Sequence, residues 1–137
     1  MVRRYKTSRY NPSFTRRYLA LFLEVIIMID FSSLFKELDN NSESIQLVLE
    51  AFLEEYRDCQ ITINQLYKEQ NWPQLFMLAH SLKGILTSFG EMEVSALLTN
   101  IETQSSVNGP VNEVDINEIC QLMPLVEFQI KQELDKR

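Results

Sequence analysis

Apolar residues recur at steps of three and four along most of this chain, which is the spacing of amphipathic α-helices. The clearest run lies within residues 71–90. When successive side chains are placed about 100° apart, its apolar positions form one stripe, which consists of Leu75, Leu78, Leu82, Ile85, Leu86 and Phe89. Asn71 can cap the start, Pro73 suits the first turn, and Gly90 fits the position just past the end, where a positive φ is wanted. The pattern predicts a helix over residues 72–89.

The same spacing predicts further helices on both sides of this one. A short helix is expected over residues 30–39, with Asp30 as its cap. The main helices are expected over residues 42–70, 72–89, 91–106 and about 112–134. Ser42 is expected to cap the first of them, and its apolar stripe is Ile45, Val48, Leu49, Phe52, Tyr56, Cys59, Ile63 and Leu66.

The connections between the main helices are short, so consecutive helices should be antiparallel neighbours. The predicted fold is therefore all-α, an up-down antiparallel four-helix bundle with one or two extra N-terminal helices. Trp72, at the reversal into the 72–89 helix, is expected to plug one end of the bundle. Pro124 should kink the last helix or split it near Leu122, because proline has no backbone N–H.

The N-terminal part differs in composition from the rest. Residues 1–17 are basic and lack periodicity, and residues 18–29 are apolar apart from Glu24. We therefore divide the chain into an N-terminal extension, residues 1–29, and a bundle domain, residues 30–137. A signal peptide is disfavoured because the basic lead is long, Glu24 interrupts the apolar run, and no small-residue cleavage site follows.

Several interpretations of the extension stay open. It can be a helix that packs on the bundle, an anchor at a membrane surface, or the product of a start codon upstream of Met28. The apolar run is too short to span a bilayer as a helix, which takes about 20 residues. Membrane contact is therefore not our main expectation, and fractionation with and without the extension would test it.

Charge divides the chain in the same place. Residues 1–29 hold six basic residues and one acidic residue, a net +5, whereas residues 30–137 hold seven basic and eighteen acidic residues, a net −11; the sum is −6. An acidic helical body argues against nucleic-acid binding. Cys59 and Cys120 fall within helical patterns, and we expect free thiols in a reducing cytoplasm.

One face of the 72–89 helix is unusual for a solvated surface. His80 points directly away from the apolar stripe, and a glycine lies one turn further along, although glycine inside a helix costs about 1 kcal/mol relative to alanine. The missing Cβ of Gly84 clears space beside the imidazole. Lys83 can place an ammonium near a negative group attached to His80. The same face also carries Pro73, Phe76, Met77 and Thr87.

These residues resemble a known family. The run His80-Ser81-Leu82-Lys83-Gly84, followed by Phe89-Gly90, closely resembles the H-x-L-K-G motif of histidine phosphotransfer (HPt) domains. The resemblance extends from about Asp30 to the C-terminus and includes the stretch from Phe52-Leu53 to Leu66 and the pair Ile101-Glu102. Leu86 stands where the family usually has a small residue, which is a mild departure in packing.

The resemblance implies a phosphocarrier and not an enzyme. His80 would be the phosphoacceptor, Lys83 would support the phosphoryl charge, and Gly84 would give clearance beside His80. The residues that dock the partner would be Pro73, Phe76, Met77 and Thr87. Non-functional roles also fit some of these residues: Lys83 can be a solvated lysine, Gly84 a packing contact, and Phe76 can be buried under the N-terminal helices.

The expected partners are receiver domains of response regulators and a hybrid sensor kinase. The receiver would supply the catalytic aspartate and Mg²⁺, so no cofactor is expected on this chain. A metal site is not expected either, because there is one histidine and the two cysteines lie in core registers on other helices. We expect a cytoplasmic monomer. The alternative hypothesis is a helical adaptor that binds receiver or kinase domains without carrying phosphate.

Overall fold

The computed structural model describes residues 29–137, and this part of the chain is helical throughout, with no strand. Predictions for residues 1–28 lie outside the described residues. The helices are α3 (Ser32–Glu37), α4 (Ser42–Tyr56), α5 (Cys59–Lys68), α6 (Trp72–Ser88), α7 (Glu93–Ser106) and α8 (Glu113–Leu134). The all-α prediction is confirmed.

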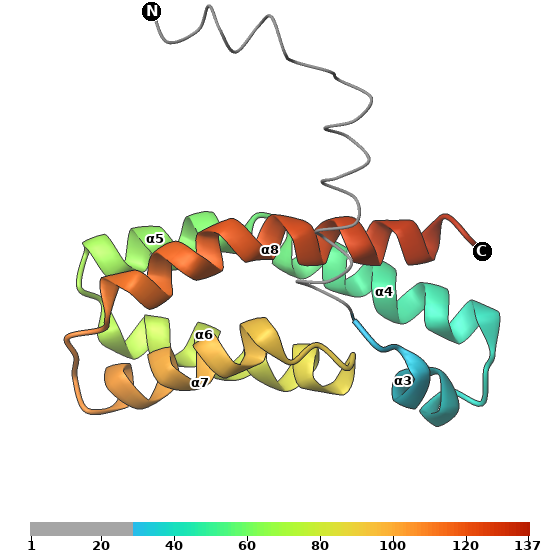
Figure 1. Cartoon of the computed structure of the whole chain (residues 1–137), viewed down its shortest axis with the longest axis horizontal. Coiled ribbons are helices and arrows are strands. Elements are labelled where there is room, and N and C mark those ends of the chain that lie inside the picture. The colour runs from blue at the N-terminus through green and yellow to red at the C-terminus, as the bar shows by residue number, and fades with distance from the viewer. Residues whose placement is uncertain (1–28) are drawn as a thin grey trace, which may run out of the picture.

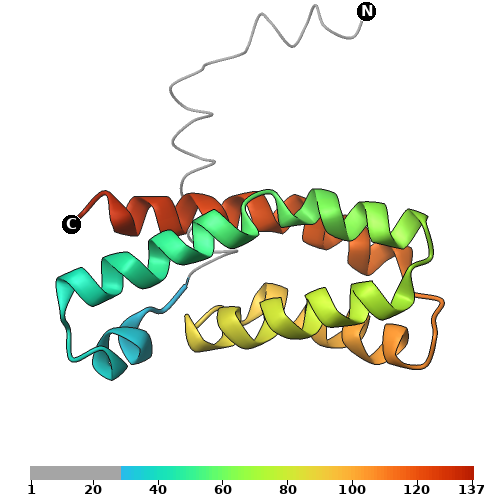
Figure 2. The ribbon, with the colours of Figure 1, turned by 180° about the vertical axis from the view of Figure 1, so that it is seen from behind.

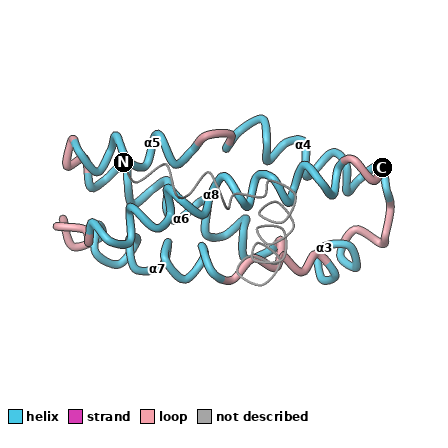
Figure 3. Tube along the Cα trace, turned by 45° about the horizontal axis from the view of Figure 1, so that its top comes forward, coloured by secondary structure: helices cyan, strands magenta, loops and turns pink. Residues whose placement is uncertain are grey.

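The helices form a two-layered antiparallel bundle (Figure 1). One layer holds α8 beside α4 and α5, which follow each other along the length of the molecule, and the other holds the hairpin of α6 and α7 (Figures 1 and 2). The short α3 lies at one end, near the turn between α6 and α7 (Figure 3). This is the up-down topology that the short connections predicted.

One predicted helix is in fact two. The 42–70 helix is interrupted after Tyr56, because Arg57 is extended (ψ 132°) and Asp58 adopts the left-handed conformation (φ 57°). The backbone N–H of Asp58 donates to the buried carboxylate of Glu127 on α8, at 3.4 and 3.5 Å. The periodicity gave no sign of the break, because both interrupted positions face outward and the apolar stripe continues across them.

The start of α6 and the ends of α7 and α8, at Ser106 and Leu134, agree with the sequence prediction, whereas other helix ends differ. The Asn71 side chain accepts from Gln74 N at 3.3 Å, as predicted. The cap of α4 is Asn41, not Ser42, and accepts from Ser44 N at 2.8 Å. Ser42 is the first residue of the helix, so the residue before it occupies the cap position, from which a side-chain oxygen can accept from the N–H three residues on.

Two further boundaries also differ. Asp30 binds the N–H of Ser32 at 3.0 Å, but the residue in the cap position of α3 is Phe31. The third main helix begins at Glu93 rather than residue 91. Of the kink and the split predicted at Pro124, the split is not observed, since α8 runs through this residue, whose side chain is on the exposed face.

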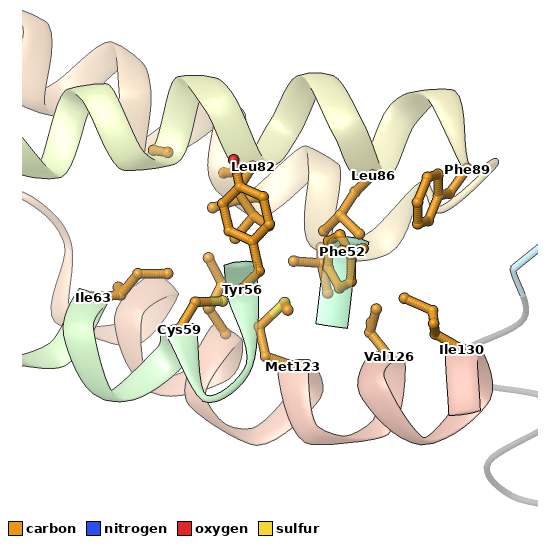
Figure 4. Packing of buried hydrophobic residues seen from close by; sticks show 14 of the residues in the cluster. Phe52, Tyr56, Cys59, Ile63, Leu82, Leu86, Phe89, Met123, Val126 and Ile130 are labelled. Atoms are coloured by element: carbon orange, nitrogen blue, oxygen red, sulfur yellow. The ribbon is translucent and has the colours of Figure 1, made fainter. Parts of the chain in front are cut away.

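The core lies between the two layers. Side chains from α4 and α5 meet those from α6 and α8 there (Figure 4), and the labelled ones are Phe52, Tyr56, Cys59, Ile63, Leu82, Leu86, Phe89, Met123, Val126 and Ile130. Of the predicted α6 stripe, Leu78 and Ile85 are only partly buried. Trp72 packs at the end of the bundle, where a Cβ on Gly109 would lie 2.4 Å from its ring. Both cysteines are free.

Candidate functional site

The outer face of α6 carries the histidine. Leu75, Ala79, Leu82 and Leu86 of this helix are buried, so their helical spacing turns residue 80 toward solvent. The side chain of His80 is 66% exposed. The predicted orientation of the imidazole, away from the core, is therefore observed.

A carboxylate from the neighbouring helix meets this face. Glu102 of α7 contacts His80 Nδ1 through Oε2, and its Oε1 accepts from Lys83 Nζ at 2.5 Å. The Glu102 side chain is only 15% exposed, and that of Lys83 is 27% exposed. Each oxygen of one carboxylate thus has its own partner on α6. The arrangement ties the two helices together directly beneath the exposed ring.

Glu102 stays ionised at neutral pH. The hydrogen bond from Lys83 lowers the pKa of its carboxyl below the usual 4.5; partial burial opposes this effect, and the hydrogen bond from His80 adds to it. A carboxylate only accepts hydrogen bonds, so Nδ1 of a neutral ring must carry the proton. We assign the tautomer from this partner. The nitrogen left with a free lone pair is Nε2.

Gly84 faces open space. An added Cβ would meet no heavy atom within 4 Å, which excludes a packing contact with another helix in the described part of the chain. The space lies one helical turn beyond His80. Open space beside the ring agrees with the clearance predicted from the missing Cβ. The functional role of Gly84 remains a prediction.

The remaining predicted residues lie on α6 around the histidine. Phe76 is partly buried and stacks on the His80 ring, with 5.9 Å between ring centroids and 16° between ring planes. Met77 is 60% exposed. Pro73 and Thr87 are exposed, and the Thr87 hydroxyl donates to Ser95 Oγ at 3.4 Å. These side chains are available at the surface, but their role in docking remains a prediction.

Glu102 was not among the predicted site residues. The pair Ile101-Glu102 entered the prediction only as part of the resemblance. The missing signal was the register of the α6–α7 hairpin: Thr87 pairs with Ser95 and His80 with Glu102, so both pairs are centred on residue 91. A hairpin that turns at that residue brings the carboxylate to the imidazole.

Within residues 29–137, no group of three or more His, Cys, Asp or Glu side chains is placed to hold a metal ion. No helix over the same residues combines the length and apolar character that crossing a bilayer requires.

The chain matches a known protein family. The family model described as "Hpt domain" matches residues 47–136, from within α4 to the end of the bundle and including the histidine site. No curated protein and no solved structure matches significantly. The match covers well over half of the chain.

Proposed function

We propose that this chain, which belongs to the Hpt domain family, is a phosphorelay intermediate that accepts a phosphoryl group on His80. Membership of this family supports a phosphotransfer role in two-component signalling and interaction with receiver domains and kinases. Our proposal adds the acceptor residue and the direction of transfer. The donor is an aspartyl phosphate of a receiver domain, and the next acceptor is a response regulator.

One observation carries the proposal. An imidazole that projects from the bundle has one nitrogen bound to Glu102 and the other directed away from that partner. A nucleophile has to reach a phosphorus atom held on another protein, and only an exposed nitrogen can do so. The open space at Gly84 admits the surface that carries the phosphoryl group.

The chemistry is an in-line displacement. The Nε2 lone pair of His80 forms the P–N bond, while the P–O bond to the donor aspartate breaks and its electron pair leaves on the aspartate carboxylate. Lys83, one turn from His80, offers an ammonium to the phosphoryl oxygens. Passing the group to the next aspartate reverses these bonds.

The chain acts as a carrier in this scheme and not as a catalyst. The receiver domain supplies the aspartate and the Mg²⁺ that neutralises charge during phosphoryl transfer. The exposed residues around His80, chiefly Met77 with Gly84, Pro73 and Thr87, form the surface for that partner, and Phe76 supports the ring.

The test is transfer from labelled receivers. Purified protein is incubated with radiolabelled phospho-receivers, and label on the chain is measured after acid and after alkali, since phosphohistidine is acid-labile and base-stable. We expect the wild type to gain base-stable label and His80→Gln to gain none. Because the ring is exposed, the variant should keep its circular dichroism spectrum and unfold cooperatively. Label on a folded His80→Gln variant would overturn the assignment, and binding without label would favour the adaptor.

A further inference from the structure

Glu102 makes contacts that the transfer scheme above does not use. It lies next to the fully buried Ile101, and its two carboxylate oxygens bind His80 and Lys83 separately. The carboxylate is 15% exposed, while the imidazole above it is 66% exposed. A largely buried carboxylate therefore contacts the exposed imidazole through one oxygen and the ammonium of Lys83 through the other.

We propose that Glu102 is a positioning residue that keeps Nδ1 of His80 protonated before and after transfer, so that the P–N bond breaks with neutral imidazole as the leaving group. This inference rests on the proposed function, since it concerns the lifetime of phosphohistidine at residue 80. It assigns a role to the charge of Glu102 and not only to its shape.

The bonds balance in both directions. With Nδ1 protonated, attack through Nε2 gives a phosphorylated ring that carries a formal positive charge, next to the negative carboxylate. When the P–N bond breaks, its electron pair returns to Nε2 and leaves a neutral imidazole. Without the Nδ1 proton, the same cleavage would release an imidazolate anion, which is a much poorer leaving group. No net proton enters or leaves the site.

Lys83 belongs to the same mechanism. In the unphosphorylated protein its ammonium is held by Glu102 Oε1 at 2.5 Å. An arriving phosphoryl group brings a second anion within one helical turn, and the flexible side chain can exchange one partner for the other. Glu102 then faces the positively charged ring alone. Holding Lys83 in place beforehand lowers the ordering entropy that the transfer would otherwise cost.

The experiment compares Glu102→Gln and Glu102→Ala with the wild type, and His80→Gln serves as the unphosphorylated control. Potassium phosphoramidate is the phosphodonor, so no receiver is involved. The ring tautomer is measured by nitrogen NMR in the free protein, and the decay of phosphohistidine is followed at mildly alkaline pH.

We expect a single Nδ1–H tautomer of His80 in the wild type. Glu102→Gln should show the same tautomer, because its amide oxygen can still accept the hydrogen bond. Glu102→Ala should show a mixture of the two tautomers. Loss of one charge-assisted hydrogen bond should lengthen the half-life of phosphohistidine by roughly three- to tenfold in Glu102→Ala. The half-life in Glu102→Gln should lie between those of the wild type and Glu102→Ala, because glutamine keeps the hydrogen-bond acceptor but not the charge. A purely structural role would change the melting temperature and leave tautomer and half-life unchanged.

Equal tautomer populations in all three proteins, or equal half-lives, would overturn the proposal. If Glu102→Ala does not fold, the nearly isosteric Glu102→Gln still gives the half-life. The tautomer is measured without any phosphate, and the half-life without any receiver. Failure of every receiver to label the wild type would therefore count against the proposed function and not against the role of Glu102.

Discussion

At the scale of single residues, His80 and Gly84 are placed by helical geometry alone. A position opposite a buried stripe is exposed whatever the neighbouring helices are, and the structure has both residues at the surface. Because no atom of residues 29–137 packs on Gly84, the described part of the fold does not explain its presence. Open space next to a candidate acceptor is the remaining explanation that the structure supports.

Substitutions at Gly84 separate stability from docking. Gly84→Ala should raise the free energy of unfolding by up to about 1 kcal/mol, because alanine favours a helix interior and its Cβ meets no atom. Urea denaturation measures this. Gly84→Glu should fold equally well but lose transfer from a receiver, since a large acidic side chain then lies beside the imidazole. A destabilised Gly84→Ala would reveal a packing role that the structure does not contain.

At the scale of elements, the α6–α7 hairpin is the unit that assembles the site. The helices turn tightly at residues 89–92, and the buried Glu91 carboxylate accepts from the N–H groups of Val94 and Ser95, at 3.0 Å each. This cap fixes where α7 starts. The register that brings Glu102 to His80 follows from that start.

Glu102 should make this hairpin sensitive to acid. Its pKa in the folded protein is lower than the usual value, chiefly through Lys83, so its stabilising effect is present above the unfolded-state pKa and is lost as pH falls through the folded-state pKa. We expect the stability difference between wild type and Glu102→Gln to shrink as pH falls below about 4.5. Denaturation curves across pH measure it, and a difference that grows in acid would contradict the assigned contacts.

Gly90, in the turn of the hairpin, packs against the backbone of Asp30 at the start of the described residues. Its φ is 85°, and a Cβ there would lie 1.9 Å from the carbonyl oxygen of Asp30, whose N–H donates to Gly90 O at 3.4 Å. Gly90→Ala should lower the free energy of unfolding by roughly 2 kcal/mol or more, through backbone strain and the clash. Gly84→Ala is the matched control, with the opposite sign. If the two substitutions change the free energy of unfolding equally, the close contact between Gly90 and Asp30 is contradicted.

At the scale of the whole molecule, one core spans both layers. Cys59 lies within it, at the start of α5. Burial, with the nearby Glu127 carboxylate as a further cause, raises the pKa of its thiol to about 12. Cys120 is only partly buried, and burial raises its thiol pKa as well. The two thiols therefore differ in access and report on different opening events.

Thiol labelling should distinguish these events. The thiolate is the reactive form, so Cys59 should react with an aromatic disulfide reagent only when the bundle unfolds, and Cys120 should react sooner through local opening. Absorbance gives the two phases, and Cys59→Ala should remove the slow one. The stabilising substitution Gly84→Ala should slow the reaction of Cys59 further. An unchanged rate would show that labelling of Cys59 does not require global unfolding.

The amino-acid sequence by itself determined the helices, their apolar faces, the outward position of His80 and the motif around it. All of these depend on periodicity and on neighbours within about one turn. Tertiary structure alone decided the break after Tyr56, where the N–H of Asp58 donates to a carboxylate 69 residues away, and the contact of Glu102 with His80 and Lys83. A hydrophobic stripe shows which side of a helix faces inward, but a contact between two helices also depends on their register, which the turn and its buried cap set.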